Sequence, residues 1–296
     1  MRKHKFLFLF YVVACLFMAI SCSSTPDEPT DPNTPDNGDN TGSGSGDNGS
    51  GDNNSGSGAG QVLFYDDFEG GSNIPDTTKW VLCERSTSNW ARYLSESYDQ
   101  AYQENGSLYL VGEKSGDSYL TGGIETRGKF EFQYGKVECR ARFVRQPKGN
   151  HTGIWMMPAP PAEKWPKSGE IDIMEHLGDD NIVYETVHSW YLDDMDVKNP
   201  TGQTTVAIDN TEWNTYGVTW TPDSITYTVN GQSYLSYPNL HLADAENAAY
   251  QWPFNHPFYL ILSQSLGGAG TWAGPIDNAA LPAVFEIDWI KVTSLD

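Results

Sequence analysis

The stretch Lys136-Val137-Glu138-Cys139-Arg140-Ala141-Arg142-Phe143 alternates charged and apolar side chains at every position. In a β-strand, successive side chains point to opposite faces, so this pattern puts the charges on one face and the apolar groups on the other. The stretch therefore predicts a strand with one solvated and one buried face. It also places Cys139 in the core.

Similar short apolar or alternating runs follow one another along most of the chain. They are Val62–Tyr65, Ser107–Val111, Lys129–Phe132, Ile154–Met157, Thr186–Trp190, Trp213–Trp220, Ser224–Val229, Phe258–Leu262 and Val284–Val292. Turn residues such as Asn230-Gly231 separate them, and no segment keeps a helical period. We therefore expect an all-β domain, a sandwich or jelly roll of two antiparallel sheets with more than about ten strands.

The first 21 residues are typical of an export signal peptide. Basic residues at the start precede the apolar run Phe6–Ile20, which is shorter than the roughly 20 residues of a membrane-spanning helix. The sequence Ala19-Ile20-Ser21-Cys22 resembles a bacterial lipobox, which implies that Cys22 is lipidated. Ordinary signal cleavage with an incidental Cys22 is the alternative. The lipid anchor implies the cell envelope, at the outer membrane and exposed on the cell surface, or else the periplasm.

Residues 22–60 hold the lipidated Cys22 and a linker of Ser, Thr, Pro, Asp, Asn and Gly. Such a segment cannot bury enough apolar surface to offset the entropy of ordering, so we expect a disordered tether with a reach of roughly 35 Å. Residues 61–296 then form the single folded domain, which we expect to be a monomer.

Charge and cysteine content exclude two classes of protein. The chain has 39 acidic and 18 basic residues, a net charge of −21, which excludes a phosphate-binding surface and nucleic acid as a partner. The folded part carries two cysteines, Cys83 and Cys139, too few for a disulfide scaffold. Whether these two are paired remains open.

Three acids lie within the strand-like segment Gly169–His176. A regular strand puts Glu170 and Asp172 on one face and Glu175 on the other, but a one-residue β-bulge near Ile173-Met174 would bring all three together. Retaining hydrolysis of a glycosidic bond needs a carboxylate nucleophile and a carboxylic acid about 5–5.5 Å apart. The spacing therefore predicts a glycosidase site with Glu170 and Glu175 as the pair. Solvated acids on an ordinary sheet face are the alternative.

The run Glu170–Glu175 matches the ExDxxE signature of glycoside hydrolase family 16. Other segments resemble the laminarinase-like branch of that family, in the same order along residues 61–296. They are Thr126–Glu138, Trp165-Pro166, Thr186–His188, Pro253–Leu260 and Leu266–Gly268. The resemblance implies a β-jelly roll with an open substrate cleft.

The resemblance also implies roles for the three acids. Glu170 would be the nucleophile, Glu175 the general acid/base and Asp172 the supporting carboxylate. No cofactor is required for this chemistry. A structural calcium is implied on the convex side, where Asp67 and Asp288 resemble the family's ligands.

Four further residues are candidates for substrate binding. Trp155 and Trp165 would be stacking platforms for sugar rings, and His188 would lie beside the cleft, within reach of Asp172 or of the sugar. Each of the three could instead be structural. Gln264, on a strand that is otherwise largely apolar, is a weaker candidate for a hydrogen bond to a sugar hydroxyl.

The substrate is the least determined part of the prediction. Laminarinase-like members carry Trp-Pro-Ala before the strand of Trp155, whereas this chain reads Gly149–Ile154 there and continues into Pro158–Pro161. We expect a retaining endo-β-glycosidase acting on a β-1,3- or mixed-linkage glucan. An endo-β-1,4-galactosidase acting on host mucin O-glycans or keratan is the main alternative, ahead of agar-like polymers. A surface glycan-binding lipoprotein without turnover is the alternative from another class.

Overall fold

The computed structural model describes residues 60–295, which form two facing antiparallel β-sheets. The strands are β1 (Val62–Asp66), β2 (Val81–Leu82), β3 (Ala101–Glu104), β4 (Ser107–Ser115), β5 (Ser118–Thr121), β6 (Gly123–Glu125), β7 (Gly135–Arg145), β8 (Asn150–Pro158), β9 (Glu170–Leu177), β10 (Ile182–His188), β11 (Gln203–Ala207), β12 (Asn214–Trp220), β13 (Ser224–Val229), β14 (Gln232–Pro238), β15 (Phe258–Leu266) and β16 (Ala283–Thr293). The all-β prediction is confirmed.

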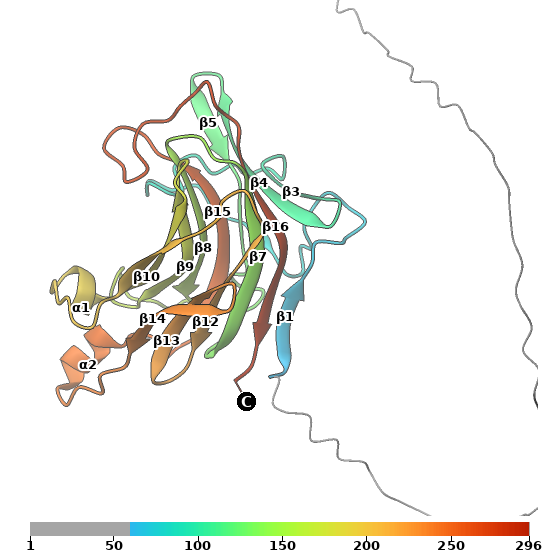
Figure 1. Ribbon diagram of the computed structural model, residues 1–296. Helices are drawn as coiled ribbons and strands as arrows, with labels where there is room; N and C mark the ends of the chain where they lie inside the picture. The colour runs from blue at the N-terminus through green and yellow to red at the C-terminus, as the bar shows by residue number, and fades with distance from the viewer. Residues whose placement is uncertain (1–59, 296) are drawn as a thin grey trace, which may run out of the picture. The chain divides into compact units, whose positions relative to one another are not determined.

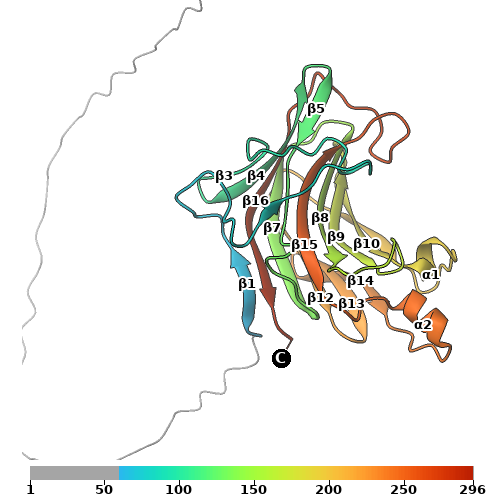
Figure 2. The ribbon, with the colours of Figure 1, turned by 180° about the vertical axis from the view of Figure 1, so that it is seen from behind.

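The two sheets differ in their strand order. The nine-stranded sheet runs β14-β13-β12-β7-β16-β4-β3, with β1 paired to β16 and β5 to β4. The seven-stranded sheet runs β11-β10-β9-β8-β15-β6-β2. Figures 1 and 2 show them as two layers, with β7 and β16 in one and β8, β9 and β15 in the other. Strands distant in sequence are thus neighbours, and β9 lies inside the seven-stranded sheet between β8 and β10.

The core fills the space between the layers. In β7 the exposed and buried positions alternate, and Cys139 is fully buried, as the sequence predicts. In β15 all nine residues are buried. Its two faces are both covered, because one contacts the core and the other lies under side chains of the loops around Trp90.

Two of the expected strands are wrong in extent. Lys129–Phe132 forms a turn followed by one isolated bridge, from Phe132 to Phe258, because the backbone N–H groups of Lys129 and Phe130 both bond to the Thr126 carbonyl. The run that begins at Thr186 leaves the strand after His188, since Ser189 caps a short helix.

Two short helices interrupt the strand succession. They are α1 (Trp190–Asp193) and α2 (Ala245–Gln251), which lie side by side at one end of the domain (Figure 1). Each starts at a side chain that accepts a backbone N–H, Ser189 in α1 and Asp244 in α2. Within residues 60–295, neither helix has the length or the apolarity to cross a membrane.

The remaining sequence predictions concern cysteines and the N-terminal region. Cys83 and Cys139 are both buried and free, so they do not form a disulfide. The predicted signal peptide, the lipidated Cys22 and the linker lie outside the described residues, apart from Gly60.

Candidate active site

A β-bulge in β9 determines how its acids are placed. Against β8, Asp172 pairs with Trp155 and Met174 with Ile154, so Ile173 is an extra residue without a register partner. The pairing with β10 shifts at the same place. The predicted bulge is therefore present, at Ile173.

The extra residue reverses the alternation of side chains beyond it. Glu170, Asp172 and Glu175 consequently share the face that points away from the core, while Ile171 and Met174 are fully buried between the sheets. This is the arrangement that the sequence analysis predicts for the three acids.

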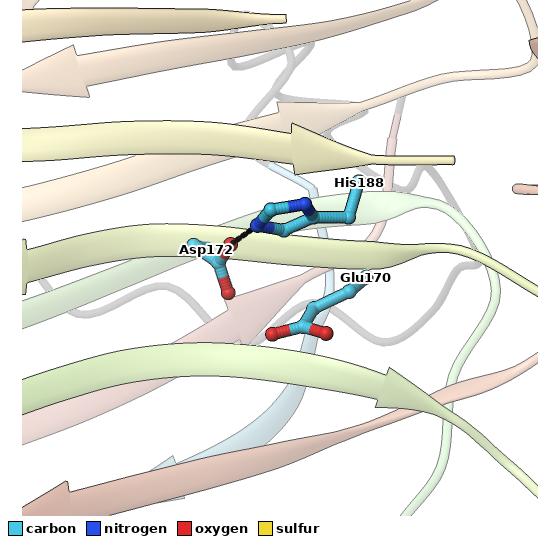
Figure 3. Close-up of side chains that lie close together, drawn as sticks. All are labelled: Glu170, Asp172 and His188. Atoms are coloured by element: carbon cyan, nitrogen blue, oxygen red, sulfur yellow. Dashed lines mark ion pairs between the residues drawn. The ribbon is translucent and has the colours of Figure 1, made fainter. Parts of the chain in front are cut away.

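Asp172 is the most deeply buried of the three, with 2% of its side chain exposed. Its Oδ2 lies 3.3 Å from Nε2 of His188, and Nδ1 of the same ring lies 2.9 Å from Oδ1 of Asp193. Figure 3 shows the ion pair between Asp172 and His188, with Glu170 beside it on the strand of Asp172. His188 thus lies between two carboxylates, one from β9 and one from α1.

The electrostatics of this group follow from burial and pairing. Burial, with the charge of Glu175, raises the pKa of Asp172. Burial also acts to lower the pKa of His188, but hydrogen bonds to Asp172 and Asp193 outweigh it and raise that pKa to about 11. His188 is therefore a cation at neutral pH and offsets the charge of Asp172.

Glu170 receives a hydrogen bond from an exposed tryptophan. Nε1 of Trp165 donates to Oε2 of Glu170 at 2.5 Å, and 48% of the Trp165 residue is exposed. Burial and the charge of Asp172 raise the pKa of Glu170 well above its usual range. Ionisation of Glu170 is therefore disfavoured both by burial and by the neighbouring charge of Asp172.

Glu175 contacts a histidine that the sequence analysis did not select. Nε2 of His151 lies 2.9 Å from Oε1 of Glu175. Both Glu170 and Glu175 line a small cavity of about 50 Å³. Its other lining residues are Trp90, His151, Gly153, Trp155 and Ser263.

Two larger hollows adjoin the acids. One, of about 230 Å³, shares Trp90 and His151 with the small cavity and also includes Trp272. The other, of about 330 Å³, includes His188, Asp193 and Lys198. One hollow lies near Glu175, through His151, and the other lies near Glu170, whose register partner is His188. We call this face of the seven-stranded sheet, with the three acids and the hollows, the groove face.

Comparisons with known proteins agree with this geometry. Residues 88–291 match the family model of glycosyl hydrolases family 16. The chain belongs to glycosyl hydrolase family 16. It is therefore a glycoside hydrolase, and the jelly-roll fold that the resemblance implies is confirmed by its structural neighbours.

Several members of family 16 are similar over most of the folded region. A keratan-sulfate endo-1,4-beta-galactosidase of Sphingobacterium multivorum is 35% identical over 79% of this chain, and this chain spans 55% of that protein's length. A beta-glucanase of Rhodothermus marinus is 32% identical over 78% of this chain and 84% of its own length.

Solved structures of family 16 proteins match as well. One, from a study of endo-acting O-glycanases with which human gut microbiota initiate mucin breakdown, has a TM-score of 0.71 and 32% identity, covering 80% of this chain and 100% of its own. The laminarinase from Rhodothermus marinus has the same TM-score, with 28% identity and coverage of 80% and 98%.

The residues predicted to bind sugar differ from one another in their surroundings. Trp165 and His188 lie beside the acids. Trp155 is 7% exposed, donates from Nε1 to Ser263 Oγ at 3.1 Å and lines the small cavity, so it belongs to the core and to the site.

The prediction that Gln264 contacts the sugar is wrong. It lies on the core-facing side of β15, is fully buried, and bonds to Asn150 and Thr152. Its polar side chain, on the otherwise apolar core face of β15, belongs to a hydrogen-bonded cluster between the sheets, because buried amides require partners.

The candidate metal sites gain no support from the contacts. Asp288 is paired with Arg140, and Oδ1 of Asp67 accepts a hydrogen bond from the backbone of Glu69. The structural calcium stays a prediction. Among residues 60–295, Glu170, Asp172 and His188 are the one group of acids and histidines with metal-ligand spacing. Both nitrogens of His188 already face carboxylates, which fits an ion pair better than a metal ligand.

Sequence reasoning missed several residues of the groove. His151 could have been found, because it is four residues from Trp155 on the same strand face. Trp90 and Trp272 could not, since they come from loops whose return to the sheet leaves no periodic signal. The ring of Trp272 packs edge-on against His151 and Tyr184, with centroids 5.4 and 4.9 Å away.

Proposed function

We propose that this protein is a retaining, endo-acting β-glycosidase in which Glu170 is the nucleophile and Glu175 the general acid/base. Glu170 attacks the anomeric carbon while Glu175 protonates the leaving oxygen, which breaks the glycosidic bond and forms a glycosyl ester. Glu175 then removes a proton from water, which releases Glu170. Two inversions give net retention.

One observation carries this proposal: the bulge puts the three acids on one face, with two of them lining the same cavity. The reaction needs an ionised carboxylate as nucleophile and a second carboxyl that gives a proton to the leaving oxygen. The Trp165 N–H and the His188 cation favour the ionised form of Glu170. We therefore assign the nucleophile to Glu170, which leaves the acid/base role to Glu175.

Asp172 and His188 act on the reaction through Glu170. Asp172 lies between the two reacting acids in sequence and is fixed by His188, which Asp193 anchors in turn. When Glu170 becomes an ester it loses its charge, and Asp172 remains as a fixed negative charge near the sugar. A charge that is already in place stabilises the oxocarbenium-like transition state without reorganisation.

Endo action is supported by the groove. The hollow near Trp272 and the hollow near Lys198 lie on different sides of the acids, so a polymer can extend past the cleavage point in both directions. Exposed aromatic rings such as Trp165 and Trp272 give it stacking surfaces.

We infer that the substrate is a β-1,4-linked galactose-containing glycan of the mucin O-glycan or keratan type. This inference rests on the 35% identity to the keratan-sulfate endo-1,4-beta-galactosidase and on the similarity to the structure from the O-glycanase study. The segment Gly149–Ile154, which departs from the laminarinase-like pattern, supplies His151 to the groove. A β-1,3- or mixed-linkage glucan is the second candidate, because the beta-glucanase and laminarinase of Rhodothermus marinus are nearly as similar.

A product screen of the purified protein tests these proposals. Keratan, mucin O-glycans, laminarin and mixed-linkage glucan are incubated with the wild type, with Glu170→Gln and with Glu131→Gln as an exposed control. We expect oligosaccharide ladders from one substrate class, with β-configured first products by NMR. Glu170→Gln should lose at least about a thousandfold in kcat. First products in the α configuration would overturn the retaining mechanism, and retained activity in Glu170→Gln would overturn the nucleophile.

We also propose that the protein is a monomer, anchored to the outer membrane through a lipid on Cys22. The lipobox-like sequence before Cys22 and the linker composition support the anchor. Metabolic labelling with a palmitate analogue should mark the wild type and leave Cys22→Ser unmarked. Equal labelling of both would contradict the anchor. A purified domain that sediments as a dimer would contradict the monomer.

A further inference from the structure

The Glu175 carboxyl has one hydrogen-bond partner among the described residues, and it is His151. The contact joins Nε2 of His151 to Oε1 of Glu175 at 2.9 Å, and the two side chains are 23% and 15% exposed. Oε2 receives no hydrogen bond within residues 60–295. One carboxyl oxygen is thus held by the protein while the other is left for the substrate.

His151 is itself held firmly. Its backbone lies within β8, where it pairs with Leu177 of β9 and with Ser265 of β15. The Trp272 ring packs edge-on against the imidazole. Neighbouring strands on both sides and an aromatic ring therefore fix the position of the imidazole relative to Glu175.

The strand residue opposite Glu175 supplies no side chain that could hold its carboxyl. Gly153 is the register partner of Glu175 on β8 and has no side chain, and a Cβ there would lie 3.0 Å from the Trp155 ring. The space above Gly153 is taken by Trp155 and Ser263, which bond to each other and not to Glu175. Among the described residues, the hydrogen bond to His151 is therefore the polar contact that fixes the Glu175 carboxyl.

We propose that His151 is the positioning residue of the acid/base, which holds Oε1 of Glu175 and so leaves Oε2 as the oxygen that exchanges a proton with the glycosidic oxygen and with water. The inference rests on the proposed function, since it assumes that Glu175 is the acid/base. The hydrogen bond persists through both half-reactions, because Oε1 neither gains nor loses the transferred proton.

The titratable groups around Glu175 define what its pH dependence reports. Glu170 and Asp172 face it from its own strand, and Tyr184 is its register partner on β10. Tyr227 approaches from β13 on the core side. His151 is the one basic group in hydrogen-bond contact with Glu175, so replacing it removes a donor that favours the ionised carboxylate.

The test compares His151→Leu with His151→Gln, whose amide can still donate. His241→Leu is the matched control, because Nε2 of His241 contacts Asp223 at 3.0 Å in the same way on the exposed surface. The substrates are the phenyl and 2,4-dinitrophenyl β-glycosides of the disaccharide released from the natural glycan. The dinitrophenyl leaving group needs no protonation, whereas the phenyl group does.

We expect His151→Leu to lose about ten- to a hundredfold in kcat/KM on the phenyl glycoside and little on the dinitrophenyl glycoside. The basic limb of its pH profile should move to higher pH. His151→Gln should recover part of the loss, and His241→Leu should behave as the wild type. A His151→Leu enzyme that loses activity equally on both substrates, with an unmoved pH profile, would overturn the inference.

Glu175→Ala separates failure of this inference from failure of the proposed function. If Glu175 is the acid/base, this variant shows strong leaving-group dependence and is rescued by azide, which forms a β-glycosyl azide. Absence of both effects would refute the role of Glu175 itself. Their presence, together with a His151→Leu enzyme that matches His241→Leu, would refute only the role of His151.

Discussion

The two faces of the seven-stranded sheet both bury carboxyl groups, but they treat them differently. On the groove face, Asp172 contacts His188 and Glu170 accepts the Trp165 N–H. On the core face, Glu185 of β10 is fully buried and neither of its oxygens has a hydrogen-bond partner among the described residues. Burial raises the pKa of Glu185 to about 8.

The difference shows what keeps a charge available inside a protein. Burial without partners makes a carboxyl neutral at physiological pH, as for Glu185. On the groove face a cation and a donor act against burial, and the pKa of His188 reaches about 11 as the other half of the same interaction. The groove face therefore holds a cation, His188, beside its buried acids, whereas Glu185 has no partner among the described residues.

Removing the charge of Asp172, the partner of His188, should have the largest effect on activity. In Asp172→Asn the pKa of His188 should fall, because the hydrogen bond to Asp172 is one of the contacts that raise it. We expect kcat/KM to drop roughly a hundredfold, since a preorganised charge near the sugar is lost. NMR titration of His188 and steady-state kinetics measure the two effects. Asp223→Asn, which removes the partner of surface His241, is the control. An unchanged His188 titration would contradict this account.

On the core face, replacing Glu185 should change how stability depends on pH. The folded-state pKa of about 8 lies above the ordinary value of 4.5, so unfolding releases a proton between these pH values. The free energy of unfolding of the wild type should therefore fall as pH rises through this window. Glu185→Gln removes that contribution, which is on the order of a few kcal/mol.

Urea unfolding at pH 5 and pH 8 measures this effect. The Glu185→Gln variant should lose less stability between the two pH values than the wild type. Parallel pH dependence in the two proteins would mean that Glu185 is solvated or paired in solution. Glu246→Gln, at an exposed position of α2, controls for loss of one negative charge.

Gly169, the residue before β9, offers a test of whether packing on the core face of the sheet positions the acids on the groove face. Gly169 precedes Glu170 with φ of 80°, and a Cβ there would lie 2.5 Å from Cε1 of buried Phe254. Gly128 has a similar φ of 70° with no atom within 4 Å of its would-be Cβ. Both alanine variants carry a left-handed strain of about 1–2 kcal/mol, and only Gly169→Ala adds a clash of about 1–3 kcal/mol.

Thermal unfolding and kcat then distinguish the two glycines. Gly169→Ala should be less stable than Gly128→Ala and should lose activity, because relief of the clash moves Glu170. Equal stability of the two variants would show that Phe254 yields at little cost.

The sequence predicted the features that follow from strand periodicity. Alternation in β7 placed Cys139 in the core, and the spacing of the acids in β9 required the bulge that the structure shows at Ile173. His188 was expected near Asp172 and lies there. These predictions succeeded because one face of each strand is buried, and burial fixes register.

The features that the sequence did not reveal are one local hydrogen-bonded turn and two contacts between distant segments. The turn at Lys129 forms because Thr126 accepts two backbone N–H groups, and no hydrophobic pattern marks that choice. Gln264 looked like a sugar ligand because its amide partners, Asn150 and Thr152, are far away in the chain. Trp272 reaches the groove through a long loop, whose path local propensity does not determine.

The bulge at Ile173 also bears on insertions and deletions. If Ile173 were absent, each acid would be two residues from the next one along the chain. A regular strand, without a bulge, would then still place all three acids on the groove face. The length of the motif can therefore differ by one residue between proteins whose acids lie in the same places. An alignment gap inside such a motif can thus leave the site intact, whereas a gap between Glu170 and Asp172 would direct one of the two into the core.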